Sequence, residues 1–135
     1  ITMELYLSPI KKALASLSQI LARPEVETDP DLRDGAIQRF EYTFELSWKL
    51  MQKVLDLDRD PESVPSYGKK DLFRVMAKKG LISDAEAWFN FLDARNQTVH
   101  GYDQKQAEIV FKEAKKFPVQ VLELIKNVEN RHTTQ

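Results

Sequence analysis

The chain of 135 residues contains no cysteine, two histidines and four glycines. Without cysteine it can form neither a disulfide nor a thiolate metal site. Scarce glycine, together with prolines that fall mostly between apolar segments, is typical of a helical protein. The sequence also lacks a glycine-rich phosphate loop, so nothing in it indicates an intrinsic nucleotide-binding fold.

Long apolar runs and excess charge are absent as well. No apolar stretch approaches the roughly 18–20 residues that a membrane-spanning helix needs, and the first residues lack the pattern of a secretory signal. We therefore expect a soluble, cytoplasmic protein that does not bind membranes. The formal net charge of −1 argues against a protein that coats nucleic acid nonspecifically. The length fits one domain, residues 1–135, and a hydrophobic fraction of 42% is enough for its core.

Apolar residues recur at intervals of three and four along most of the chain, which predicts amphipathic helices. Short connections between long helices imply antiparallel neighbours. The sequence therefore predicts an all-α, up-and-down four-helix bundle with one additional short helix. The expected helices cover residues 3–22, 30–57, 68–79 (the short one), 83–99 and 103–130.

Polar residues and glycine stand where the ends of these helices are expected. Asp29 can cap the second helix, with Pro30 at its first position, where a missing N–H costs nothing. Ser83, followed three residues later by Glu86, forms a capping-box pattern before the fourth helix. Gly80 is expected to end the third helix. The other candidate caps are Ser66 for the third helix and Asp103 for the fifth.

Two of the predicted helices carry further information about packing. The second is apolar on two sides, so it is either central in the bundle or shared with a partner subunit. The fifth keeps a regular apolar spacing through Pro118, which should kink the helix rather than end it. The apolar stripe of the fifth helix consists of Val110, Ala114, Phe117, Val121, Leu124 and Val128.

The segment 93–103 contains the most informative residues for chemistry. Arg95, His100 and Tyr102 follow one another in the order R-x4-H-x-Y at the end of the predicted fourth helix. Histidine alone has an unperturbed pKa near neutrality, so His100 is the candidate acid–base group. The other histidine, His132, lies close to the end of the chain.

The last two turns of the predicted fourth helix break the pattern of apolar and polar residues. Arg95 interrupts an apolar stripe, and Asp93, Asn96 and His100 make the adjacent flank polar. Such breaks are expected where function overrides packing. Alternatively, the residues form a structural network in which Asp93 pairs with Arg95 or with an arginine of another helix, and His100 caps the helix end. One histidine with scattered carboxylates is not a recognisable ligand set, so no metal is expected.

These residues fit metal-free phosphoryl chemistry on RNA, for which no cofactor is needed. A neutral His100 can take the proton from a ribose 2′-hydroxyl, and Arg95 can hold the phosphate and offset its developing charge. Positions five apart on a helix stand about 140° apart, so the two converge only if the arginine reaches around or the helix loosens near Gly101. A second chain would supply a second His100, so we expect a symmetric homodimer with the site in its cleft.

Charged residues on other helices can contribute to this site. Glu41 and Glu45, one turn apart on the second helix, either orient Arg95 or His100 or are simply solvated. A basic cluster on the third helix is either a solvated face or a patch that steers RNA phosphates toward Arg95. The members of this cluster considered for RNA binding are Lys69, Lys70, Arg74 and Lys78.

With these motifs in place, the sequence resembles the HEPN family of small helical bundles. The closest resemblance is to HEPN toxins encoded beside a minimal nucleotidyltransferase (MNT) antitoxin, a group also known as nucleotidyltransferase substrate-binding proteins. The resemblance covers nearly the whole domain. It rests on segments 33–49, 79–82, 87–89 and 92–96, which give the R-x4-H-x-Y motif its helical context.

The resemblance implies a metal-independent ribonuclease toxin of a type VII-like HEPN/MNT pair, acting as a homodimer. Arg95 and His100 would then be the catalytic pair, with Asn96 adjacent and Asp93 and Glu41 in support. The alternative is a non-catalytic substrate-binding subunit of a two-component nucleotidyltransferase.

The resemblance also gives Tyr102 a role. It matches the tyrosine that the partner antitoxin modifies with AMP from ATP. A bulky anion two residues from His100 would exclude RNA from the site and repel its phosphates. Without the family, the favoured interpretation of Tyr102 is a partly buried ring that packs at a turn.

Overall fold

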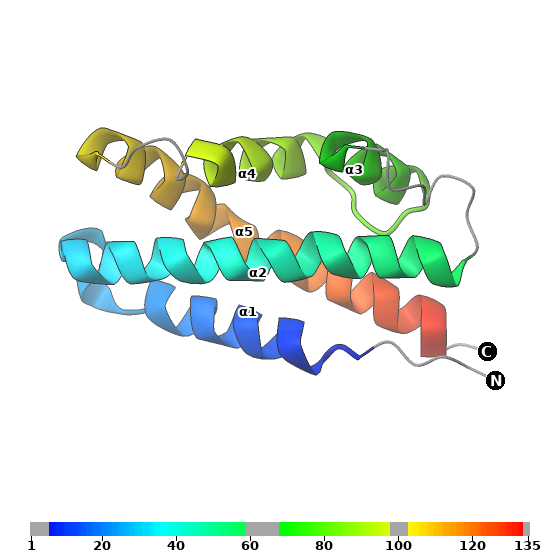
Figure 1. The fold of residues 1–135 in the computed structure, drawn as a ribbon. Coiled ribbons are helices and arrows are strands. Elements are labelled where there is room, and N and C mark those ends of the chain that lie inside the picture. The colour runs from blue at the N-terminus through cyan, green and yellow to red at the C-terminus, as the bar shows by residue number, and fades with distance from the viewer. Residues whose placement is uncertain (1–5, 59–67, 98–102, 134–135) are drawn as a thin grey trace.

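The structure is a computed structural model that describes residues 6–58, 68–97 and 103–133. All regular elements in these ranges are helical: α1 (Ser8–Leu21), the 3₁₀ turn η1 (Pro24–Glu27), α2 (Pro30–Leu57), α3 (Lys69–Lys78), α4 (Ala85–Gln97) and α5 (Gln104–Thr133). Figure 1 shows α1 and α2 antiparallel, α3 and α4 along the opposite edge of α2, and α5 crossing behind α2. The predicted all-α, up-and-down bundle with one additional short helix is confirmed.

Helix α2 is the central element, and its bounds match the prediction. Asp29 caps it, since its Oδ1 accepts a hydrogen bond from the Asp31 N–H at 2.9 Å, and Pro30 follows at the first position. The helix packs against α1, α3 and α5, which explains why it is apolar on two sides. Tyr42 of this helix is 41% exposed.

The first helix begins later than predicted, and the reason is Pro9. Tyr6 and Leu7 are not helical, and α1 starts at Ser8. Proline has no N–H and fixes its own φ, so it is accommodated in the first turn of a helix and not in its interior. A start at residue 3 would have placed Pro9 in the interior, so the apolar spacing indicated too early a start.

The predicted capping box before α4 is wrong. Asp84 is the cap, since its Oδ1 accepts a hydrogen bond from the Ala87 N–H at 3.0 Å. The backbone N–H of Ser83 donates instead to Glu123 of α5 at 2.9 Å. Both residue types cap helices well, so sequence alone did not separate two adjacent candidates.

The ends of α3 and α5 agree with expectation where the structure describes them. Gly80 adopts φ +78°, and the N–H groups of Gly80 and Leu81 donate to the carbonyls of Ala77 and Met76, both at 3.0 Å. This is the double hydrogen bond of a Schellman motif. Asp103 caps α5 by accepting from the Gln106 N–H at 2.8 Å, and α5 continues through Pro118 to Thr133. Ser66 lies outside the described residues, and Gly68 occupies the N-cap position of α3.

An aromatic cluster at the centre of the bundle holds α4 against α2 and α5. Phe117 of α5 is completely buried, and its ring centroid lies 5.0 Å from that of Phe40 and 4.8 Å from that of Phe91. The Trp88 ring of α4 lies 5.4 Å from Phe117 and 6.3 Å from Phe44. Because rings of α2, α4 and α5 interlock here, the rotation of α4 about its axis is fixed, and with it the direction of Arg95.

Candidate functional site

Arg95 lies in the last turn of α4 and points toward α2. Its Nε atom is 3.6 Å from Glu45 Oε1, and the two side chains are 26% and 34% exposed. The other carboxylate oxygen of Glu45 accepts a hydrogen bond from Trp48 Nε1 at 3.0 Å. Glu45 is therefore fixed by its own helix, and it orients the guanidinium at the end of α4. Of the two glutamates considered from the sequence, Glu45 contacts Arg95, whereas Glu41 is half-buried one turn earlier.

The polar flank of α4 is arranged differently from the network considered above. Asp93 is exposed, and its Oδ1 lies 3.9 Å from the Nζ of Lys70 on α3. The alternative in which Asp93 pairs with an arginine thus gives way to a pair with a lysine, which the packing of α3 against α4 brings to it. Asn96 is exposed as well. The roles of Asp93, Asn96 and Glu41 in a reaction remain predictions.

His100 and Tyr102 lie outside the described residues. Helix α4 ends at Gln97 and α5 begins at Gln104, directly after the cap Asp103. The convergence of Arg95 and His100 in space therefore stays a prediction.

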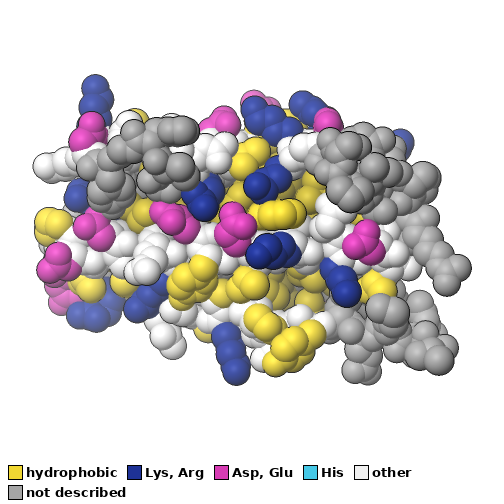
Figure 2. Space-filling view, viewed as in Figure 1, with side chains coloured by type: hydrophobic (Ala, Val, Ile, Leu, Met, Phe, Trp, Pro, Cys, Tyr) yellow, Lys and Arg dark blue, Asp and Glu magenta, His cyan; other side chains and the backbone are white. Residues whose placement is uncertain are grey.

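The basic cluster of α3 lies on aromatic surface that it shares with α2 and α4. Lys69 Nζ is 4.6 Å from the Trp48 ring centroid, so it joins the same group of side chains as Glu45 and Arg95. Arg74 lies 5.1 Å from the Phe89 ring and pairs with Asp71 at 2.6 Å. Figure 2 shows lysine and arginine side chains gathered over α3 and α4, with hydrophobic surface between them.

The sequence left two interpretations of this basic cluster open: a solvated face, or a patch that steers RNA phosphates toward Arg95. The contacts assign its members to different interpretations. Lys69 adjoins the Arg95 site through Trp48. Arg74 and Lys70 are engaged by carboxylates, as on an ordinary solvated face. Lys78 is exposed at the end of α3.

Trp48 is a member of this site that the sequence did not reveal. Its spacing on α2 placed it in the apolar stripe, and it is indeed partly buried against the core. Its indole N–H nevertheless bonds Glu45, three residues earlier, and its ring lies beneath Lys69. The i, i+3 spacing of a carboxylate and a tryptophan was the available signal.

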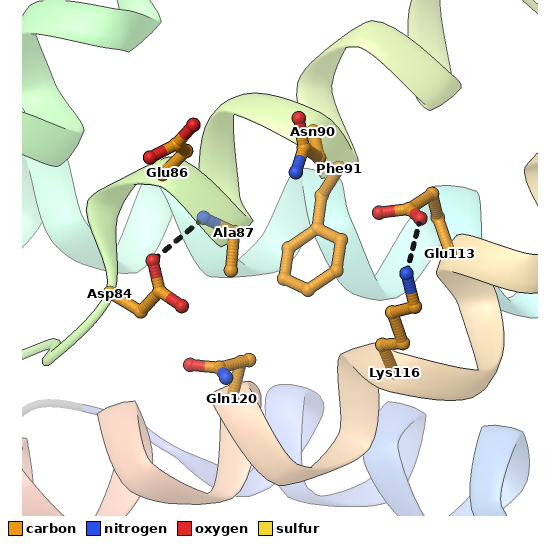
Figure 3. A pocket seen from close by; sticks show the side chains of 8 residues that line it. All are labelled: Asp84, Glu86, Ala87, Asn90, Phe91, Glu113, Lys116 and Gln120. Carbon is orange, nitrogen blue, oxygen red and sulfur yellow. Dashed lines mark hydrogen bonds and ion pairs between the residues drawn. The ribbon is translucent and has the colours of Figure 1, made fainter.

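A hollow of about 450 Å³ lies between the start of α4 and the middle of α5 (Figure 3). Three of its polar side chains already have structural roles: Asp84 caps α4, and Glu113 pairs with Lys116 at 3.1 Å. Within the described ranges no group of three His, Cys, Asp or Glu side chains is placed to hold a metal ion. None of the described helices is long and apolar enough to cross a membrane.

Residues 5–130 match the family described as "Nucleotidyltransferase substrate binding protein like". This chain belongs to that family. It is the HEPN group that the sequence resembles. A curated relative, the probable ribonuclease HepT of Haemophilus influenzae, is 36% identical over 99 residues, which cover 73% of this chain and 68% of the relative.

Solved structures agree with this membership. A Haemophilus influenzae protein, described as revealing the fold of a substrate binding domain of a nucleotidyltransferase, has a TM-score of 0.81 and 32% identity, covering 92% of this chain and 99% of that protein. A protein of Thermus thermophilus has a TM-score of 0.72 and 31% identity, covering 87% of this chain and 96% of that protein. The helical bundle is therefore the fold of the family, and this chain contains nearly the whole length of the two solved relatives.

Proposed function

We propose that this protein is a metal-independent endoribonuclease toxin of a type VII-like HEPN/MNT pair, active as a homodimer in the cytoplasm. The observation that carries the proposal is the placement of Arg95. Glu45 of α2 holds its guanidinium at the end of α4, five residues before His100 in the sequence. The kinship with a probable ribonuclease, HepT, supports the same reaction class.

In the proposed reaction, the RNA strand is cut by its own ribose. His100 takes the proton of a 2′-hydroxyl, and the 2′-oxygen attacks the adjacent phosphorus. The bond from phosphorus to the 5′-oxygen breaks, which leaves a 2′,3′-cyclic phosphate and a 5′-hydroxyl. A second imidazole, His100 of the partner subunit, supplies the proton that the leaving oxygen needs.

Arg95 stabilises the charge that develops on the phosphate. A guanidinium is planar, remains charged at any working pH and can bind two phosphate oxygens at once. Glu45 contacts the Nε atom, so the arginine is oriented before RNA binds and little reorganisation is needed in the transition state. Lys69, next to Trp48, would attract the strand toward this position.

Control of the toxin is assigned to Tyr102 and a cognate nucleotidyltransferase. Transfer of AMP from ATP to the tyrosine oxygen, with release of pyrophosphate, would add a negatively charged nucleotide two residues from His100. Substrate would then be excluded both sterically and by charge.

The second candidate function is a substrate-binding subunit without chemistry of its own. The description of a solved relative as a substrate binding domain of a nucleotidyltransferase favours it. Both candidates share the fold and the partner, so an assay of RNA cleavage separates them.

The test compares purified wild type with His100→Ala and Tyr102→Phe in the presence of EDTA. Wild type and Tyr102→Phe should cut RNA and leave cyclic phosphate ends, whereas His100→Ala should lose at least about a hundredfold in rate, the order of effect of a general base. Circular dichroism should show equal helix content in all three proteins. Added partner and ATP should inactivate wild type but not Tyr102→Phe. Equal cleavage by His100→Ala, or a strict need for a divalent ion, would contradict the proposal.

A further inference from the structure

A second hollow, of about 480 Å³, lies between the start of α2 and the first half of α5. Its lining is mainly basic, with two carboxylates and two apolar side chains among the cations. The cationic residues are Arg33, Lys105, Lys112 and Lys115.

After its internal ion pair is formed, the hollow keeps three cations, Arg33, Lys105 and Lys112, against one carboxylate, Glu108. Lys115 Nζ lies 3.0 Å from Glu27 Oε1, so these two charges offset one another. Lys105 and Lys112 are exposed and seven residues apart on α5. Seven residues make two turns, so they share one face and stand about 10 Å apart along the axis. Two lysines of this kind are spaced to contact successive parts of an extended anion.

Arg33 supplies a third cation with an unfilled hydrogen-bonding position. Its side chain is 18% exposed, and its buried Nε–H has no hydrogen-bond acceptor among the described residues. The ion pair with Asp34 Oδ1, at 3.9 Å, is too long for a hydrogen bond. A buried charged donor without an acceptor is costly, and an anion bound in the hollow would offset the charge of this guanidinium.

Apolar surface lies directly beside these cations. Ile109 is 46% exposed, although most large apolar side chains of α5 are buried. Phe111 forms part of the wall, and Lys115 lies 4.9 Å from its ring centroid. Cations next to exposed apolar surface suit a nucleotide chain, which offers phosphates and the apolar faces of its bases and sugars, better than an inorganic anion.

Lys105 follows Tyr102 by only three residues in the sequence, in the first turn of α5. We propose that the hollow formed by Arg33, Lys105 and Lys112 binds successive phosphates of single-stranded RNA, outside the catalytic residues. The inference rests on the proposed function, because it treats the strand held here as a continuation of the strand to be cut. It concerns binding and not chemistry, so it can be tested separately.

The experiment measures binding of a fluorescently labelled, single-stranded oligouridylate by anisotropy over a range of salt concentrations. The protein carries His100→Ala, so that the RNA stays intact. Lys105→Gln/Lys112→Gln is compared with Lys12→Gln/Lys126→Gln, which removes two exposed lysines from other surfaces. The slope of log K against log salt is negative, and each lost phosphate contact should reduce its magnitude by about 0.7. The hollow variant should therefore lose about 1.4 from the slope, and the control should keep the wild-type value.

Equal slopes for the two double variants would overturn the inference. So would unchanged RNA binding combined with weaker binding of the nucleotidyltransferase, because the hollow would then be a protein contact. ATP that binds with the same lysine dependence, without competition from RNA, would assign the hollow to a free nucleotide and overturn the RNA assignment.

The binding experiment can support or refute the RNA-binding site whether or not the protein cleaves RNA. A protein that binds RNA through these lysines but never cuts it would refute the nuclease and keep the binding site. A protein that cuts RNA without any lysine dependence would refute the binding site alone.

Discussion

Arg95 depends on a residue that sequence spacing does not connect to it. The guanidinium contacts Glu45, fifty positions earlier on another helix, and Glu45 is held in turn by Trp48. The sequence showed Arg95 interrupting an apolar stripe and offered two glutamates as neighbours. The structure selects Glu45, because the α2 and α4 helices meet at that level. Sequence could name the arginine, but not the carboxylate that orients it.

We expect Glu45→Gln to slow RNA cleavage more than Glu41→Gln does. The amide keeps the size of the side chain but loses the charge that attracts Arg95. A misplacement of roughly 1 Å can cost about a hundredfold in rate, so a loss of ten- to a hundredfold in kcat is expected for Glu45→Gln. The measurement is kcat from steady-state cleavage with saturating RNA. A larger loss for Glu41→Gln would transfer the orienting role to that residue.

Among the elements, the turn between α3 and α4 shows why local sequence predicts helix ends well. Gly80 allows the positive φ that lets two backbone N–H groups satisfy the last carbonyls of α3. This requirement is local, and glycine meets it at little steric cost. The start of α4 was missed because two neighbouring residues could each cap it, and a contact with α5 engages Ser83.

We expect Gly80→Ala to lower the free energy of unfolding by about 1 to 2 kcal/mol, because an L-residue at positive φ brings its Cβ close to a backbone oxygen. The strain is confined to the local backbone, since outside the adjoining residues a Cβ at this position would meet nothing within 4 Å. Gly68→Ala is the matched control, because it also has open space but an extended backbone conformation. Urea unfolding measures both variants. Equal stability of the two would show that the turn tolerates alanine.

In the molecule as a whole, the aromatic cluster ties three helices into one unit. Phe117 contacts rings from α2 and α4 while standing on α5, one residue before the proline in that helix. The periodicity of α5 predicted that Phe117 is buried, and it is. Which rings surround it could not be predicted, because that depends on how far each helix is rotated and shifted in the bundle.

We expect Phe117→Ala to destabilise the protein by about 3–5 kcal/mol, the range for removing a buried phenyl ring and leaving a cavity. Val119→Ala, two residues later but 72% exposed, should change stability by less than about 0.5 kcal/mol. Thermal and urea unfolding followed by circular dichroism provide the comparison. A small effect of Phe117→Ala would mean that the neighbouring rings collapse into the space.

Local sequence was sufficient to predict the five helices, most of their ends and the R-x4-H-x-Y motif. Helical periodicity and caps depend on residues within a few positions of one another, so a linear sequence contains that information. Only the folded chain reveals that Glu45 orients Arg95, that Asp93 meets Lys70, and that Arg33 shares a hollow with lysines of α5. Each of these arrangements joins residues of different helices. Whether such residues come together depends on how core packing rotates each helix about its axis and shifts it along that axis.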